Sequence, residues 1–477
     1  MEVNNVLMVS AEVSPFAKTG GLGDVVGSLP RYLNNLGLDC RVIMPLYSTI
    51  DNKFRKDMQY LGYIYVDLGW RHQYCGIFYL EYKGVKHYFL DNEFYFKGDK
   101  LYDDRDLEKF SFLSVASFEV CKFLDFHVDV IHVHDWHSAA MCALLNDKYC
   151  HDPFFYNTKS VVTIHNIAYQ GIYSKNDVLS LLPLDGNKYQ NTETINLLAL
   201  GLTYAYKITT VSPTYAQEIL RDEYGEGLQY LLRQERDKIV GILNGIDTTE
   251  YNSKTDDKIY YNFTKSNFKE GKEKNKIALL EDIGMDASEA SKPLIGVVSR
   301  LVSQKGLNLL IPNLIKLVDS GINFVILGTG DNYIENQLKF FNYLKPNNIK
   351  IFLKFDNVLA HRIYAGCDFV LMPSAFEPCG LAQMIALRYG TLPIVRSCGG
   401  LHDSITPFNE YENTGNGFSF NNFSTNDLFN TVLYANSIYL RKDKLDVVIK
   451  NGLACDFSWE KSAKKYRDLY NSLWYNQ

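Results

Sequence analysis

Short runs of apolar, β-branched residues recur along the whole chain, and each is followed by turn residues and then by a helical pattern. Such nearly continuous apolar runs are typical of strands that are buried on both faces. Their alternation with helices predicts βαβ units and parallel sheets. The predicted strands are 6–10, 128–133, 160–164 and 207–211 in the first half, and 294–299, 323–328, 349–353, 369–373 and 392–396 in the second.

The two series of strands predict an α/β protein made of two Rossmann-like, doubly wound domains that face an inter-domain cleft. The 477 residues suffice for two such domains, each with a full core. We expect domains over residues 1–243 and 244–455, and a C-terminal helix over 456–477 that packs back on the first domain. Residues 36–101 are aromatic and polar, and they predict antiparallel strands or hairpins inserted in the first domain.

Composition and charge exclude several classes of protein. The net charge is −6 and the pI is about 6.0, so the basic footprint of a nucleic-acid-binding protein is missing. No run of about 18 apolar residues occurs, so we expect no transmembrane helix. The amino terminus lacks the regions of a signal peptide, and the nine cysteines contain no CxxC pair. These features predict a cytoplasmic protein without a disulfide framework.

A glycine-rich turn, KTGGLGD (Lys18–Asp24), follows the first predicted strand. Gly20 and Gly21 let the backbone approach a ligand closely, and the helix that follows offers unpaired N–H groups to an anion. Lys18 adds a positive charge. The spacing fits neither a dinucleotide fingerprint nor a Walker loop. The turn therefore predicts a phosphate-binding loop or, equally, a loop that merely starts a helix.

A similar arrangement, SRLVSQKGL (Ser299–Leu307), follows the first strand of the second series. Arg300 and Lys305 lie where a loop enters a helix, and two cations at a helix start can neutralise a diphosphate. Such cations would stabilise the charge that develops on a leaving nucleoside diphosphate. The alternative is that both are solvated surface charges.

A single carboxylate, Glu377, stands between a strand and a helix in FEPCGLAQ (Phe376–Gln383). It can accept hydrogen bonds from sugar hydroxyls and stabilise positive charge at an anomeric carbon. The alternative is an acid placed favourably at a helix start. Cys379 is interpreted as a small buried residue and not as a nucleophile.

Two strand ends in the first half carry histidines. HVHDWH (His132–His137) departs from the di-metal pattern HxHxDH, and no clustered ligand set completes a metal site. We interpret it as a loop that lines a cleft, with Asp135 as the substrate contact and metal binding as the minor alternative. His165 directly follows the next strand, where its imidazole can bond a sugar hydroxyl.

Taken in order, these pieces resemble the bacterial glycogen synthase and plant starch synthase family. The order begins with KTGGLGDV, DNE-x-YF (Asp91–Phe96), HVHDWH, TIHN-x-AYQG and ITTVSPTYAQEI. It continues with NGID (Asn244–Asp247), SRL-x-x-QKG, GTGD (Gly328–Asp331), LAHRIYAG-x-D, FEPCGL-x-Q, YGTLPIVR and DFSW. The resemblance runs from about residue 5 to about residue 472, and the ordered set is far more specific than any single motif.

The resemblance implies a GT-B fold and a retaining hexosyltransferase that needs no cofactor and no metal. Glucose would pass from ADP-glucose, rather than UDP-glucose, to the non-reducing end of an α-1,4-glucan such as glycogen. The implied catalytic residues are Asp135, His165, Arg300, Lys305 and Glu377. The implied substrate-binding residues are Lys18, Gly20, Gly21, Asn244, Gly330, Phe355, Cys379, Gly380 and Leu381.

Some positions depart from the pattern of that family. Phe355 stands where tyrosine is usual, Ala375 replaces a larger and often basic residue, and Cys398 stands where threonine is common. These departures leave the donor base and the acceptor affinity open. The sequence also leaves open the oligomeric state and the chemical route to retention, by front-face departure or through a covalent intermediate.

Two other classes of function remain as alternatives. One is a different retaining GT-B enzyme, such as a sucrose or trehalose-phosphate synthase or an enzyme that glycosylates lipids or small acceptors. The KTGGLGD and FEPCGL-x-Q motifs argue against it. The other is a non-catalytic relative that binds glucan or nucleotide sugar as a regulator. The intact Arg300, Lys305 and Glu377 argue against that reading.

Overall fold

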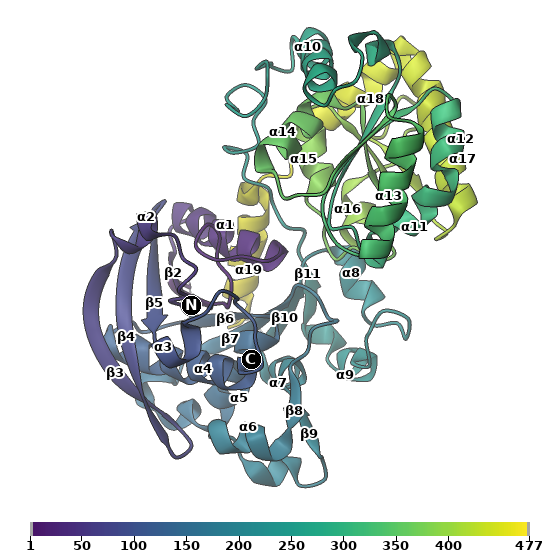
Figure 1. Ribbon diagram of the computed structural model, residues 1–477. Coiled ribbons are helices and arrows are strands. Elements are labelled where there is room, and N and C mark those ends of the chain that lie inside the picture. The colour runs from purple at the N-terminus through teal and green to yellow at the C-terminus, as the bar shows by residue number, and fades with distance from the viewer. Residues whose placement is uncertain (1–2, 475–477) are drawn as a thin grey trace. The chain divides into compact units, whose positions relative to one another are not determined.

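The computed structural model describes residues 3–474, which divide into two units (Figure 1). The first unit comprises residues 3–245 and 459–474, and the second comprises residues 246–458. The chain therefore passes from the first unit to the second and returns for its last helix. The divisions at 245/246 and 458/459 lie two and three residues beyond those expected from the sequence.

The first unit is built on a nine-stranded sheet with the order β11-β10-β7-β6-β1-β2-β5-β4-β3. Its strands are β1 Asn5–Val9, β2 Asp39–Pro45, β3 Gln59–Leu68, β4 Arg71–Tyr82, β5 Val85–Asp91, β6 Val130–His134, β7 Lys159–Ile164, β10 Lys207–Thr210 and β11 Ile239–Gly241. All pairs from β11 to β5 are parallel. A separate antiparallel pair joins β8 Ile172–Ser174 to β9 Thr194–Asn196.

The region 36–101 differs in part from its prediction. β3 and β4 do form an antiparallel hairpin, and β4 also pairs antiparallel with β5. However, β2 and β5 are parallel members of the main sheet, so the region extends that sheet and is not an insertion beside it. The sequence signal was weak because β3 and β4 are buried on one face only. Their outer face exposes aromatic side chains such as Tyr63, Tyr65 and Tyr74.

Helices pack against the first sheet, and the last helix of the chain is one of them (Figure 1). The helices of the first unit are α1 Gly21–Asn35, α2 Asn52–Arg55, α3 Glu93–Phe96, α4 Asp106–Phe123, α5 Asp135–Asp147, α6 Lys175–Leu181, α7 Leu197–Tyr204, α8 Pro213–Glu218, α9 Gln229–Gln234 and α19 Trp459–Ser472. In α19 the buried residues Trp459, Ala463, Tyr466 and Tyr470 recur at helical spacing and form one apolar face. This face packs beside α1, and the Tyr470 hydroxyl reaches His132 of β6 at 2.7 Å.

The second unit is built on a six-stranded, fully parallel sheet with the order β14-β13-β12-β15-β16-β17. Its strands are β12 Leu294–Val298, β13 Asn323–Leu327, β14 Ile349–Phe352, β15 Phe369–Met372, β16 Leu392–Arg396 and β17 Phe418–Phe420. Its helices are α10 Phe268–Asp282, α11 Leu307–Leu310, α12 Leu314–Asp319, α13 Asn332–Leu344, α14 Asn357–Gly366, α15 Ala382–Arg388, α16 Gly399–Ser404, α17 Thr425–Leu440 and α18 Lys442–Ala454.

The strand order reverses once in the parallel part of each sheet. In the first unit β1 lies between β6 and β2, and in the second unit β12 lies between β13 and β15. In open α/β sheets, ligands bind beyond the carboxyl ends of the strands at such a reversal. The pairs β1/β6 and β12/β15 therefore mark one candidate binding position in each unit. Within residues 3–474, no helix has the length and apolar character needed to cross a bilayer.

Candidate active site

The residues singled out in the sequence lie at the carboxyl ends of parallel strands in both units. In the first unit, Lys18, Gly20 and Gly21 follow β1, Asp135 follows β6, His165 follows β7 and Asn244 follows β11. In the second unit, Arg300 and Lys305 follow β12, Gly330 follows β13, Phe355 follows β14, and Glu377, Cys379, Gly380 and Leu381 follow β15. Because all these strands are parallel, their carboxyl ends share one edge of each sheet.

The glycine-rich loop of the first unit already holds a carboxylate. Glu12 accepts hydrogen bonds from the backbone N–H of Thr19 at 2.5 Å and of Gly20 at 3.1 Å. The hydroxyl groups of Thr19 and Tyr102 donate to its other oxygen at 2.7 and 2.5 Å. An internal carboxylate therefore already binds the two backbone N–H groups that directly precede α1.

The other groups of the loop are less constrained. Lys18 Nζ lies 2.7 Å from Asp24 Oδ1, and both side chains are partly exposed. A Cβ atom added at Gly20 or Gly21 would meet no atom within 4 Å, so the surface of these glycines is open. The backbone at these two glycines is therefore accessible.

Asp135 begins α5 and holds the backbone of the next strand end. It is 5% exposed, and its Oδ1 accepts the N–H of His165 at 2.7 Å and of Asn166 at 3.4 Å. Burial raises the pKa of the Asp135 carboxyl to about 7; the two N–H donors oppose this shift, and the charge of Glu12 adds to it. The backbone φ of Asp135 is 52°, a left-handed conformation that Asp and Asn tolerate better than most residues.

Two of the three histidines of HVHDWH, His132 and His134, are hydrogen-bonded to other side chains, whereas the buried Nδ1 of His137 has no partner within residues 3–474. His132 bonds Tyr470 through Nδ1 at 2.7 Å and Thr163 through Nε2 at 2.6 Å, and His134 Nδ1 lies 3.0 Å from His165 Nε2. Burial lowers the pKa of His132, His137 and His165 to about 3, so these rings are neutral near pH 7. Among residues 3–474, no three His, Cys, Asp or Glu side chains are grouped as metal ligands.

In the second unit, Lys305 and Glu377 form an ion pair. Lys305 Nζ lies 2.6 Å from Glu377 Oε2, and the Ser374 hydroxyl donates to the same oxygen at 2.9 Å. The two charged side chains are only 17% and 8% exposed. They are 72 residues apart in the chain and meet because β12 and β15 are neighbours at the strand-order reversal.

The loop that carries Glu377 is held by hydrogen bonds to its backbone carbonyls. Arg396 donates to the Ala375 carbonyl at 2.5 Å, Gln304 donates to the Phe376 carbonyl at 3.2 Å, and the Gly400 N–H donates to the Glu377 carbonyl at 3.1 Å. A Cβ atom at Gly400 would lie 2.1 Å from the Cys379 carbonyl oxygen, so only glycine fits there. These contacts hold the carboxylate in place without using its side chain.

Gly380 and Cys379 complete this loop. Gly380 has a φ of 72°, and Gln383 Nε2 donates to the carbonyls of Cys379 and Gly380 at 3.1 and 3.0 Å. Cys379 is buried, in agreement with its interpretation as a small packing residue. Gly380 and Leu381 lead directly into α15, whose N-cap is Leu381.

The remaining predicted residues differ in their surroundings. Arg300 is exposed, and its Nη2 donates to Gln304 Oε1 at 3.4 Å; no carboxylate in the described part of the chain pairs with it. Phe355 is 89% exposed. Gly330 donates its N–H to Glu335 at 2.9 Å and has no room for a Cβ beside Leu301. The side-chain oxygen of Asn244 is buried and has no partner within residues 3–474.

Three residues of these clusters were not singled out as site residues from the sequence. Glu12 and Ser374 lie close to motifs, but nothing in their local sequence shows that their side chains turn back to Thr19 and to Glu377. His134 was noted only as part of a metal-like motif, and its contact with His165 depends on the pairing of β6 with β7. The signal that could have found them is their position within a few residues of a predicted strand end.

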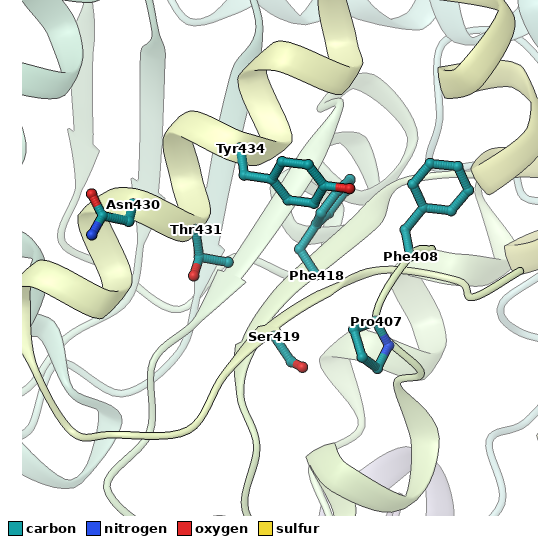
Figure 2. Close-up of a pocket in the computed structure, with 7 residues that line it drawn as sticks. All are labelled: Pro407, Phe408, Phe418, Ser419, Asn430, Thr431 and Tyr434. Carbon is teal, nitrogen blue, oxygen red and sulfur yellow. The ribbon is translucent and has the colours of Figure 1, made fainter. Parts of the chain in front are cut away.

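A pocket on the second unit lies apart from these residues. Figure 2 shows it between the edge strand β17, the loop before that strand and α17, and its volume is about 200 Å³. It is lined by Pro407, Phe408, Phe418, Ser419, Asn430, Thr431 and Tyr434. No carboxylate, lysine, arginine or histidine lines it, so it offers no charged side chain for chemistry.

Comparisons with protein families and known proteins agree over nearly the whole chain. Residues 5–234 match the family model described as the starch synthase catalytic domain, and residues 284–446 match glycosyl transferases group 1. The glycogen synthase of Lachnospira eligens is 42% identical over 99% of this chain and 100% of its own length. The glycogen synthase of Desulforamulus reducens is 45% identical over 99% of both chains.

Solved structures of glycosyltransferases have a similar fold over nearly the whole chain. The catalytic domain of starch synthase IV from Arabidopsis thaliana, bound to ADP and acarbose, has a TM-score of 0.92 and 31% identity, with 99% of each chain covered. A sucrose-phosphate synthase from Thermosynechococcus elongatus has a TM-score of 0.63 and 15% identity, covers 99% of this chain and is itself covered completely. The latter likeness extends to the fold alone.

Proposed function

This chain belongs to the starch and glycogen synthase family of glycosyltransferases, and we propose that its donor is ADP-glucose and its acceptor an α-1,4-glucan. The reaction is retaining transfer of glucose to the non-reducing end of the glucan, which elongates glycogen. Relatives named glycogen synthase cover the chain at 42–45% identity, and the related starch synthase structure holds ADP and acarbose.

The ion pair of Lys305 with Glu377 is the observation that carries this proposal most directly. The Lys305 ammonium has three N–H donors and one partner among the described residues, so donors remain for a diphosphate oxygen. The unpaired Arg300 in the same loop supplies a second cation. Preorganised cations of this kind stabilise the charge that grows on a nucleoside diphosphate as it leaves the sugar.

Glu377 has two roles in this proposal. Its Oε2 fixes Lys305 with the help of Ser374, so the ammonium does not need to reorganise during the reaction. Its carboxylate also accepts hydrogen bonds from hydroxyl groups of the transferred glucose and stabilises positive charge at the anomeric carbon. The loop contacts from Gln304, Arg396 and Gly400 keep the carboxylate in this position.

In the first unit, Asp135 and His165 are proposed to contact the transferred glucose. Both are buried at adjacent strand ends, and Asp135 directly holds the backbone of His165. A neutral imidazole can donate to a sugar hydroxyl oxygen or accept from a hydroxyl without the cost of a buried charge. The open surface of Gly20 and Gly21 would allow a ligand to approach the backbone of the same unit.

The proposal is tested by glucose transfer to glycogen, with ADP-glucose and UDP-glucose compared for the wild type and Lys305→Ala. We expect transfer from ADP-glucose and a fall in kcat of roughly 10²–10³-fold in the variant, because an electrostatic donor to the transition state is lost. Lys316→Ala, at an exposed lysine of α12, is the matched control and should keep full activity.

Each other outcome has a separate meaning. Transfer from UDP-glucose alone would keep the reaction and overturn the donor assignment. Transfer to small acceptors but not to glycogen would favour a different retaining glycosyltransferase. Binding of nucleotide sugar without any transfer would favour a regulatory protein. Because Lys305→Ala leaves Glu377 buried without its counter-ion, a melting curve must show that the variant is folded, and Lys305→Ala/Glu377→Gln removes that unpaired charge.

A further inference from the structure

A buried pair of histidines fixes the imidazole of His165. His134 Nδ1 lies 3.0 Å from His165 Nε2, and the pairing of β6 with β7 brings their two strand ends together. The backbone N–H of His134 donates to the Ser138 hydroxyl at 2.9 Å, so His134 is itself anchored. Its neighbour Asp135 holds the backbone of His165. Adjacent residues therefore constrain the ring and the main chain of His165 separately.

Both rings are neutral, so the pair contains one donor and one acceptor. Burial lowers the pKa of His165 to about 3 and that of His134 well below its ordinary value. A neutral imidazole carries a hydrogen on one nitrogen only. Two arrangements are therefore possible: His134 Nδ1–H donates to His165 Nε2, or His165 Nε2–H donates to His134 Nδ1.

The far nitrogen of His134 distinguishes the two arrangements. His134 Nε2 is buried and has no hydrogen-bond partner among residues 3–474. If His165 were the donor, His134 would have to carry its hydrogen on Nε2, as a buried N–H with nothing to accept it. Buried N–H groups without a partner are rarer than buried acceptors without one. The first arrangement leaves only an unused lone pair at that nitrogen.

We infer that His134 donates its Nδ1–H to His165 Nε2 and thereby holds His165 in the tautomer that carries its hydrogen on Nδ1. No described residue bonds that Nδ1, and His165 is 8% exposed, so this N–H is the group left to meet a ligand. His165 therefore offers a sugar hydroxyl a hydrogen-bond donor and not an acceptor. His134 is a positioning residue that acts through His165, and its effect on transfer rests on the proposed function.

The tautomer itself is tested without any turnover. Two-bond ¹H–¹⁵N correlation spectra of the full chain with ¹⁵N-labelled histidine distinguish protonated from unprotonated ring nitrogens. The ten histidines limit the overlap, and the signals lost in His165→Gln identify His165. We expect a protonated Nδ1 and an unprotonated Nε2 for His165 in the wild type. A protonated Nε2 would overturn the inference, whether or not the protein transfers glucose.

Two variants of His134 test the positioning role. Asn has a donor near the place of the imidazole Nδ1, whereas Leu keeps an apolar side chain of similar reach without a donor. We expect His134→Asn to stay within about threefold of the wild-type kcat, and His134→Leu to fall by about tenfold, as the loss of one buried hydrogen bond would give. The KM for glycogen should not change, because His134 is fully buried and acts only through His165.

His87→Leu is the matched control, since His87 is also buried and bonds a backbone carbonyl at 2.9 Å on β5. It should lose stability without the specific loss of kcat. If His134→Leu keeps both the full kcat and the Nδ1–H signal of His165, the positioning role is wrong. If His134→Leu does not fold, the spectra of the wild type and of His134→Asn decide, because the latter must retain the same tautomer.

Discussion

At the scale of single residues, Asp135 combines a buried carboxyl group with a left-handed backbone conformation. Both features cost stability, and both lie at a position proposed to contact the donor sugar. Strain and perturbed pKa values concentrate at functional sites, where the surrounding structure holds them in place. The bonds from Asp135 to the N–H groups of His165 and Asn166 show what holds this residue.

Asp135→Asn should raise the stability of the protein above pH 7 while lowering kcat. Asn tolerates the left-handed backbone and keeps an oxygen for the His165 N–H, but it carries no buried charge. The folded carboxyl has a pKa of about 7 and the unfolded one about 3.8, so wild-type stability falls as the pH rises between these values. The gain should therefore grow by up to about 1.4 kcal/mol per pH unit across that window.

Thermal unfolding at pH 5.5 and pH 8 measures this difference. Asp237→Asn, at an almost fully exposed carboxylate, serves as the control and should show no such dependence. An equal effect of Asp135→Asn at both pH values would contradict a raised pKa for the Asp135 carboxyl.

At the scale of elements, the last helix is the clearest long-range feature. α19 returns to the first unit after 213 residues of the second, and its Tyr470 is fully buried against His132 of β6. Its amphipathic pattern alone predicts a helix with one apolar face. The pattern does not determine which surface this face packs against, because that depends on the fold of the rest of the chain.

Tyr470→Phe should destabilise the first unit by about 1–3 kcal/mol, because His132 Nδ1 then remains buried without its partner. Tyr470→Ala should cost about 3–5 kcal/mol through the cavity that it leaves. Urea unfolding followed by tryptophan fluorescence measures both. Tyr156→Phe, at an exposed tyrosine of the same unit, should have no effect, and a loss in that control similar to Tyr470→Phe would refute the role of the buried bond.

At the scale of the whole molecule, each unit closes its own core around its own sheet. Unfolding of such a chain need not be a single two-state transition. The sequence offers a convenient probe, since its four tryptophans, Trp70, Trp136, Trp459 and Trp474, are all assigned to the first unit. Tryptophan fluorescence therefore follows the first unit, whereas calorimetry follows both.

ADP at about 100 times its Kd should stabilise the unit that binds it by roughly 2.7 kcal/mol. If the diphosphate is held by Arg300 and Lys305, a calorimetric transition should move to higher temperature further than the fluorescence transition does. Lys305→Ala should lose most of that shift. A shift confined to the fluorescence transition would place the diphosphate on the first unit and contradict the proposed assignment.

The sequence by itself determined most of the parallel strands and the chemical groups at their carboxyl ends. Every strand named in advance lies within one or two residues of its predicted position, because an apolar run buried on both faces is a local pattern. The strands β2 and β5 were not assigned to the main sheet. The neighbouring strands β3 and β4 are buried on one face only and carry many exposed aromatic residues. Their pattern dominates this part of the sequence and obscures the pattern of the parallel strands β2 and β5.

The partners of the site residues were decided only by the tertiary structure. Lys305 meets Glu377 because β12 lies next to β15, and His134 meets His165 because β6 lies next to β7. Glu12 accepts the N–H groups of Thr19 and Gly20 because the glycine-rich loop turns back toward the residues that follow β1. Strand order and loop closure depend on contacts between distant parts of the chain, and local residue patterns do not encode which strand becomes whose neighbour.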